Sequence, residues 1–226
     1  MNICRSIYLK WIKITDKLLK KYRCKKINHR SFSIISNNCW AGNVYRRYGK
    51  QYLTPTVGLY FFADDYVKFC GDFKFYMEQP LEFISYEQSK YSEIIKQRDQ
   101  QNVPIARLGD VEIIFLHYKT EEEAREKWER RAKRINYDNL IFKFSMMNYC
   151  TEEHLRAFDA LECDKKFCFV PPEFKDKIKC SVPFLSSKGD TEVRNDSAEY
   201  SRYINIEKLI NSKYVNGAQM AQEKKI

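Results

Sequence analysis

The chain has 226 residues, of which 44% are hydrophobic and 15% aromatic, and its formal net charge is +10. This composition is typical of a folded globular protein and excludes an intrinsically disordered chain. The eight cysteines form no C-x-x-C pair and only three histidines are present. We therefore expect reduced thiols in a cytosolic protein, and neither a disulfide framework nor a structural zinc site.

The positive charge is concentrated at the beginning of the chain. Residues 1–30 carry ten basic side chains and one acidic side chain, a net charge of +9. The remaining residues carry 30 basic and 29 acidic groups, a net charge of +1. A nearly neutral body argues against nucleic-acid binding, because that function needs basic groups spread along a contact surface.

The same basic segment has the periodicity of an amphipathic helix. At about 100° per residue, one face is apolar and the other is rich in lysine. The apolar face consists of Ile3, Ile7, Trp11, Ile14, Leu18 and Tyr22. Such a helix either lies in the headgroup region of an anionic membrane, which we assign to residues 1–26, or packs on the core of its own domain. Its lysines interrupt the apolar run too often for a secretory signal or a membrane span.

Beyond the basic segment, short β-rich runs alternate with helical stretches. This pattern predicts an α/β fold, a mostly parallel, Rossmann-like sheet with helices on both faces. Strands are predicted at residues 32–35, 56–62, 81–84, 111–118, 140–144, 167–170 and, at a sheet edge, 180–185. Helices are predicted at residues 64–77, around 94–95, and at 121–135, 151–161 and 200–210. We divide the chain into a basic amphipathic arm (residues 1–29), a single α/β domain (residues 30–212) and a mobile tail (residues 213–226).

Polar residues directly follow the first predicted strand. They are Ser36, Asn37, Asn38 and Trp40. In an open α/β sheet, ligands bind beyond the carboxyl ends of the strands, and amides with free backbone N–H groups suit an anionic or sugar-like ligand. In this interpretation Trp40 offers a flat face to a sugar or base. The alternative is that one asparagine caps the following helix and that Trp40 packs in the core.

Two acidic residues and one histidine are candidates for chemistry. Asp64 and Asp65 resemble the acidic pair with which nucleotide-sugar enzymes hold a divalent metal. They are adjacent rather than separated by one residue, however, which favours a role in capping a helix. His117 stands near the end of a predicted strand, as a general base, a phosphate ligand or a structural histidine. We assign the catalytic role, removal of a proton from an acceptor hydroxyl, to Asp65 or His117.

An arginine on the long predicted helix is a further binding candidate. Arg131 shares a helical stripe with Ala124, Trp128 and Ile135, which predicts that its guanidinium faces inward. An inward arginine needs an anion. That anion is either a buried carboxylate of the protein or an acidic ligand held bidentately.

Five segments carry a resemblance to a known family: SFSIISNNCWAG, TPTVGLYFFADDYVKF, QPLEFI, ARLGDVEIIFLHYK and EEAREKWERRAKRINYDNL. Together they resemble a bacterial exopolysaccharide-biosynthesis family that is catalogued as a domain of unknown function, family 1919. The resemblance covers roughly residues 30–212 and leaves the basic arm outside. It implies a setting in capsule or exopolysaccharide assembly and does not identify a reaction.

These observations lead to one main expectation of function. We expect a transferase of exo- or capsular polysaccharide biosynthesis that acts by glycosyl transfer on a sugar-phosphate or nucleotide-sugar ligand, in the cytoplasm or at the inner face of the plasma membrane. The alternatives are transfer of an acyl or other substituent to a sugar, and a non-catalytic membrane-associated scaffold. The cofactor is unknown: a divalent metal fits the chemistry, but the sequence contains no clear set of metal ligands. The oligomeric state is not predicted.

Overall fold

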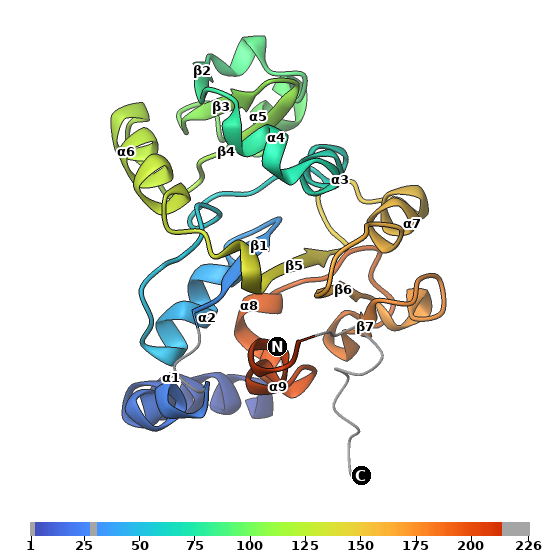
Figure 1. Cartoon of the computed structure of the whole chain (residues 1–226). Helices are drawn as coiled ribbons and strands as arrows, with labels where there is room; N and C mark the ends of the chain where they lie inside the picture. Colours follow the sequence, from blue (N-terminus) through green and yellow to red (C-terminus); the bar gives the residue numbers. More distant parts are fainter. Residues whose placement is uncertain (1–2, 28–30, 214–226) are drawn as a thin grey trace.

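A four-stranded parallel sheet lies at the centre of the computed structural model, which describes residues 3–27 and 31–213 (Figure 1). Its strands are β1 (Ser33–Ser36), β5 (Leu140–Ser145), β6 (Lys166–Val170) and β7 (Ser181–Pro183), hydrogen-bonded in the order β1-β5-β6-β7. As predicted, β7 with its Pro183 is at an edge, where a missing N–H donor costs nothing. The predicted tail lies almost wholly outside the described residues.

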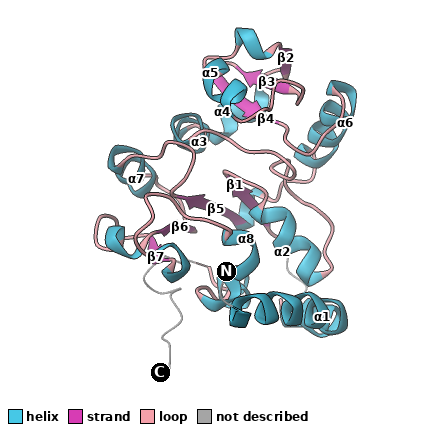
Figure 2. Cartoon of the chain, turned by 180° about the vertical axis from the view of Figure 1, so that it is seen from behind, coloured by secondary structure: helices cyan, strands magenta, loops and turns pink. Residues whose placement is uncertain are grey.

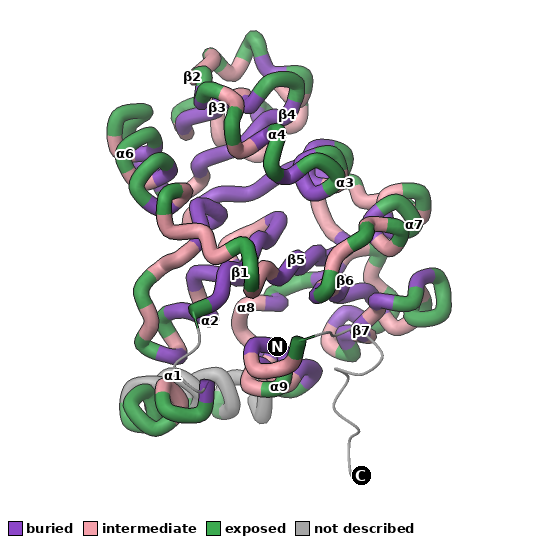
Figure 3. Tube along the Cα trace, viewed as in Figure 1, coloured by how far each residue is buried: buried purple, intermediate pink, exposed green. Residues whose placement is uncertain are grey.

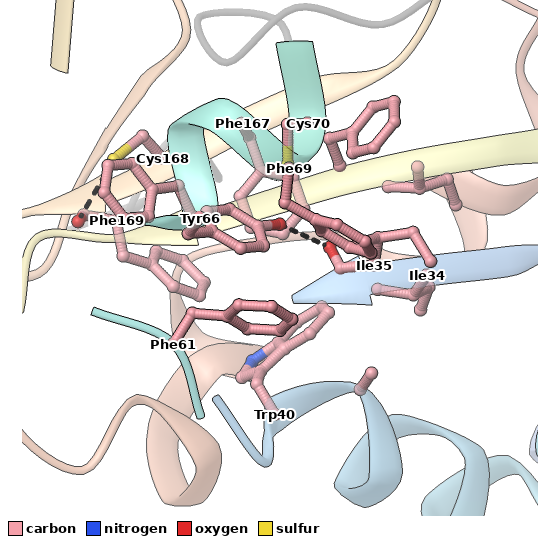
Figure 4. Close-up of a cluster of buried hydrophobic side chains, with 14 of the residues drawn as sticks. Ile34, Ile35, Trp40, Phe61, Tyr66, Phe69, Cys70, Phe167, Cys168 and Phe169 are labelled. Atoms are coloured by element: carbon pink, nitrogen blue, oxygen red, sulfur yellow. Dashed lines mark hydrogen bonds between the residues drawn. The ribbon is translucent and has the colours of Figure 1, made fainter. Parts of the chain in front are cut away.

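Helices cover both faces of this sheet, so the predicted α/β class is confirmed. The helices α2 (Trp40–Tyr48) and α8 (Asp196–Glu199) lie on one face, and α3 (Ala63–Gly71) and α7 (Glu152–Asp159) on the other. On the first face Trp40 packs edge-on against Phe167 and Phe169 of β6. On the second face Tyr66 stacks on Phe144, and its hydroxyl donates to backbone carbonyls of β1 and β5 (Figure 4).

Two further helices lie at one end of the molecule. The predicted amphipathic segment forms α1 (Ile3–Lys26), which packs beside α2 and the short α9 (Ile206–Asn211). The predicted helix at residues 200–210 is interrupted, because Asn205 caps a new helix at Lys208 N–H. The opposite end of the molecule carries a second, smaller sheet (Figure 2).

The smaller sheet is antiparallel, which corrects the prediction for two strands. It consists of β2 (Glu82–Ile84), β3 (Ile105–Leu108) and β4 (Val111–Ile114) in the order β2-β3-β4, so the predicted strands at 81–84 and 111–118 do not belong to the parallel sheet. Gly109 adopts a left-handed φ of 61° between β3 and β4. A Gly-Asp pair between two apolar runs is a hairpin signal, and it marks the strand β3 that the sequence analysis missed.

Other predicted elements differ in length. The predicted helix at 64–77 is divided at Asp72, which caps α4 (Phe73–Glu78), and the predicted strand at 56–62 is irregular, with a single bridge between Tyr60 and Ile114. Thr120 caps α6 (Glu121–Ala132) as expected. The remaining helix is α5 (Ser92–Gln97), and the short 3-10 helices are Tyr86–Gln88, Tyr137–Asn139, Pro172–Phe174, Leu185–Ser187 and Tyr200–Arg202.

The buried carboxylate of Asp65 joins the smaller sheet to α3, beside the buried carboxylate of Glu112. Asp65 accepts a hydrogen bond from the backbone N–H of Glu112 (3.1 Å) and forms an ion pair with Lys90. Glu112 in turn accepts from Ser89 Oγ (2.5 Å) and Arg107 Nε (3.1 Å). Burial raises the pKa of Asp65, and the ion pair with Lys90 opposes that rise. Because its oxygens are already occupied, Asp65 acts here as a structural link.

The adjacent aspartates allow a matched test of this link. We expect Asp65→Ala to lower the free energy of unfolding by about 2 kcal/mol, since it leaves a buried N–H and a lysine without their acceptor. The exposed Asp64, which pairs with Lys68 at 3.3 Å, should contribute less than about 1 kcal/mol. Urea unfolding of Asp65→Ala and Asp64→Ala measures both values. Equal losses in the two variants would contradict the structural role of Asp65.

Candidate functional site

One irregular segment, residues 57–63, runs across the carboxyl ends of β1 and β5; we call it the crossing segment. The Phe61 N–H donates to the Asn37 carbonyl (3.0 Å), and the Phe61 carbonyl accepts from Asn148 Nδ2 (3.0 Å). The Ala63 N–H donates to the Asn148 carbonyl (3.2 Å). Parallel sheets usually keep a ligand crevice at this position. Here the protein's own backbone occupies the ends of these two strands.

A buried ionic cluster lies beneath that edge, on the face covered by α2 and α8. Lys143, in the middle of β5, contacts Asp196 at 2.5 Å, and neither side chain has appreciable exposure. The same Asp196 oxygen accepts from Ser145 Oγ (2.7 Å) and Asn38 Nδ2 (2.9 Å). Lys143 also donates to Asn38 Oδ1 (3.0 Å). The polar groups of four side chains, from β5, the β1–α2 turn and α8, are therefore paired with one another by hydrogen bonds and one ion pair.

The ionisation of the cluster follows from its geometry. Burial alone would raise the pKa of Asp196, but Lys143 together with the hydrogen bonds from Asn38 and Ser145 holds that pKa below its ordinary value. Burial lowers the pKa of Lys143, and Asp196 opposes that fall. Neither Lys143 nor Asp196 is among the candidates predicted from the sequence. A lysine inside the apolar strand LIFKFS was a usable signal for Lys143, whereas Asp196 stands in a polar stretch without one.

The candidate residues predicted in the β1–α2 turn differ in how far they are buried. Asn37 is buried and forms two hydrogen bonds with the Ser145 backbone, one to each of its amide atoms (3.0 and 3.1 Å). Ser36 Oγ donates to the Asn38 carbonyl (2.6 Å), so it organises the turn. Trp40 is fully buried in the aromatic core and presents no face to a ligand. Only Asn38 keeps part of its surface exposed.

The crossing segment brings the more distant candidates together at its beginning. The Gly58 carbonyl accepts from the His117 N–H (2.9 Å), and the imidazole of His117 is exposed. The Leu59 carbonyl accepts from the half-buried Cys39 thiol (3.7 Å). Gly58 has a left-handed φ of 79°, and a side chain there would meet the Tyr118 ring at 3.0 Å. The β1–α2 turn and the turn after β4 thus border the same few residues.

Arg131 completes this surface. Its guanidinium, on a residue only 8% exposed, donates to the Tyr118 hydroxyl (2.6 Å) and the Val57 carbonyl (3.3 Å) and stacks over the Tyr52 ring at 5.0 Å. Within residues 3–27 and 31–213 no carboxylate pairs with it. The inward orientation predicted from the sequence is therefore observed, and the partners that the protein supplies are neutral. The guanidinium keeps a full positive charge that an anion can match.

We call the surface formed by Asn38, Cys39, Gly58, His117 and Arg131 the candidate site. Asp65 does not belong to it, because it is sealed beneath the smaller sheet. Among the described residues, no group of three or more His, Cys, Asp and Glu side chains is arranged to hold a metal ion. A cavity of about 580 Å³ lies instead at the amino ends of the strands, where Asn139, Leu140 and Lys165 contribute to its lining.

Comparison with known proteins identifies the same family of unknown function, numbered 1919. The family model described as "Domain of unknown function (DUF1919)" matches residues 11–218. An uncharacterized protein of Haemophilus influenzae is 30% identical over 154 residues, which cover 67% of this chain and 68% of the relative. The family match begins at residue 11, inside α1.

The buried ionic cluster yields a second prediction. Removing one partner of a buried ion pair costs about 3–5 kcal/mol, because the other charge is left uncompensated. Lys143→Met and Asp196→Ala should each lose this amount, and the double variant should lose much less than the sum. The pKa of Asp196 is lower in the folded protein than in the unfolded chain, so its ionised form stabilises the fold. The unmodified protein should therefore lose stability below about pH 4, as Asp196 takes up a proton.

A surface pair provides the control for this double-mutant cycle. Glu152 and Arg156 form an exposed ion pair at 3.2 Å on α7. The same substitutions there, Arg156→Met and Glu152→Ala, should show a coupling below about 1 kcal/mol. Urea unfolding of all variants measures both couplings. A coupling between Lys143 and Asp196 no larger than that of the surface pair would contradict their role.

Proposed function

We propose that this chain, which belongs to the DUF1919 family, is a transferase of surface polysaccharide biosynthesis that holds an anionic sugar ligand at the candidate site. One observation carries the proposal: the nearly buried guanidinium of Arg131 is surrounded by a hydroxyl, a carbonyl and an aromatic ring, with no carboxylate among the described residues. A guanidinium binds phosphate through two parallel hydrogen bonds, and sugar phosphates and nucleotide sugars contain phosphate.

The neighbouring groups supply the other functions that glycosyl transfer needs. Asn38, whose amide binds Asp196 and Lys143, holds the β1–α2 turn at the border of the site. The exposed imidazole of His117 accepts the proton of an acceptor hydroxyl. The acceptor oxygen then bonds to the sugar carbon, and the phosphate leaves with the bonding electron pair. Arg131 offsets the charge that develops on the departing phosphate.

The proposed role in polysaccharide assembly and the proposed cellular location rest on observations outside the candidate site. Polysaccharide assembly comes from the resemblance of the sequence to its family, and the seven cysteines whose side chains are described are free thiols, which fits a reducing compartment. We place the protein in the cytoplasm at the inner face of the plasma membrane, with α1 as the contacting element.

Transfer of an acyl group is the less favoured reaction at the same site. It would use Cys39 as a nucleophile, and the reactive form of a cysteine is the thiolate. Burial raises the pKa of Cys39, against a smaller opposing effect of the Gly58 backbone. The thiol therefore stays protonated at neutral pH, and glycosyl transfer to a hydroxyl needs no such group.

A non-catalytic scaffold is the second candidate function. The large hydrophobic side chains that α1 leaves exposed favour it, because exposed apolar surface marks interaction sites. A scaffold needs neither a proton acceptor nor an anion-binding arginine. The two functions therefore differ in how they depend on His117 and Arg131.

Ligand binding can be tested with adjacent arginines on α6. A thermal-shift panel of sugar 1-phosphates and nucleotide sugars, with and without manganese, should contain a compound that stabilises the protein by about 2.7 kcal/mol at a hundredfold excess over its Kd. We expect Arg131→Met to weaken that binding at least tenfold, since methionine keeps the packing on Tyr52 and removes the charge. Arg130→Met is the control, because Arg130 is exposed and pairs with Glu126. Equal effects of the two substitutions would overturn the proposed site.

Catalysis can be tested in cells that depend on this protein for their polysaccharide. Asn38→Ala, His117→Ala and Arg131→Ala should each reduce the amount of polymer while the protein remains folded and abundant. His117→Ala is the most informative, because the exposed imidazole makes no hydrogen bond that the fold needs. Unchanged polymer with all three variants folded would exclude the enzyme and favour the scaffold.

A further inference from the structure

Five large hydrophobic side chains of α1 point into solvent. They are Ile7, Trp11, Ile14, Leu18 and Tyr22, each between 60% and 75% exposed. Their spacing of three and four residues places them on one face of the helix. Single exposed hydrophobic residues are common on proteins, but a continuous row over four helical turns marks an interaction surface. We call this row the exposed stripe.

The rest of the molecule holds α1 with the exposed stripe outward. Lys20 packs against Gly49 at the end of α2, Ile27 is buried, and the Asn211 side chain donates to the Lys26 carbonyl (2.9 Å). Figure 3 shows α1 at the end of the molecule, with green, exposed segments along it. Of the two alternatives left by the sequence, packing of this face on the domain's own core is not what the structure shows.

Charge identifies the partner of the exposed stripe. Residues 1–30 carry a net charge of +9, and the described lysines Lys20, Lys21, Lys25 and Lys26 are exposed. Two copies of the chain joined through their stripes would bring two such segments together, and like charges repel. A membrane rich in anionic lipid offers the opposite charge together with an apolar layer for the hydrophobic side chains.

We infer that α1 is a membrane-docking helix that lies in the surface of an anionic lipid bilayer, with the exposed stripe in the acyl layer and its lysines at the headgroups. None of the helices in the described part of the chain has the length and hydrophobicity of a transmembrane segment. The inference gives a physical basis to the membrane location in the proposed function. It does not depend on the candidate site, which is formed by other elements.

Trp11 is a natural probe of this contact. It is 60% exposed, whereas Trp40 and Trp128 are buried, so a change in the surroundings of the exposed stripe dominates any change in tryptophan emission. Full-length protein should shift its emission to shorter wavelength with vesicles of phosphatidylcholine and phosphatidylglycerol, and should sediment with them. We expect at least tenfold weaker binding to phosphatidylcholine alone, and weaker binding in high salt, where charges are screened.

Two single substitutions give a matched comparison. Leu18→Asp should weaken binding to the anionic vesicles at least tenfold, because it places a charge where an apolar side chain enters the lipid. Leu185→Asp introduces the same charge at an exposed leucine outside α1 and should leave binding unchanged. Both side chains are exposed, Leu18 to 75% and Leu185 to 45%, so both variants should keep the thermal stability of the unmodified protein.

Three results would overturn the inference. The first is no binding to anionic vesicles, and the second is an equal effect of the two substitutions. The third is a dimer that forms without lipid as the protein concentration rises and that Leu18→Asp dissociates. The last result would assign the exposed stripe to a second copy of the chain. Sugar-phosphate binding, measured in the same variants, separates the two proposals. If vesicle binding fails while the Arg131-dependent stabilisation persists, only the docking helix is excluded; the reverse result would exclude only the candidate site.

Discussion

The buried contact between Lys143 and Asp196 is the interaction on which the carboxyl edge of the main sheet depends. A charged lysine in the middle of a buried strand is tolerated only with a charge partner and further hydrogen bonds. Asp196 supplies that partner from the far end of the chain, and Asn38 and Ser145 complete the contacts. One ionic contact therefore fixes α8 against β5 and orients the turn that carries Asn38 towards the candidate site.

The crossing segment decides where a ligand can bind. Its backbone hydrogen bonds to Asn37 and Asn148 occupy the position that open α/β sheets usually leave to a ligand. The functional candidates lie beside the segment, where the His117 N–H contacts Gly58, Arg131 contacts Val57 and Cys39 contacts Leu59. The affinity of this surface for an anionic ligand would come from the charge of Arg131 and from hydrogen bonds.

In these proposals the two ends of the molecule have different functions. The smaller sheet, fixed by Asp65 and Glu112, supplies the turn that carries His117. The opposite end presents the exposed stripe of α1 with the basic residues of the arm. A protein docked through α1 would keep its candidate site above the membrane surface, accessible from the aqueous side.

The sequence by itself determined the features that depend on local pattern. Apolar runs predicted β1, β5 and β6, Thr120 predicted the start of α6, and the spacing of Trp11, Ile14 and Leu18 predicted an amphipathic α1, because periodicity and capping act within a few residues. Only the tertiary structure decided which of Asp64 and Asp65 is buried, that Trp40 belongs to the core, and that β4 pairs with β3 in a separate sheet. It also supplied Asp196 as the partner of Lys143, and turned the apolar face of α1 outward. Those outcomes depend on contacts between residues far apart in the chain, and no local pattern encodes which distant group will be the neighbour.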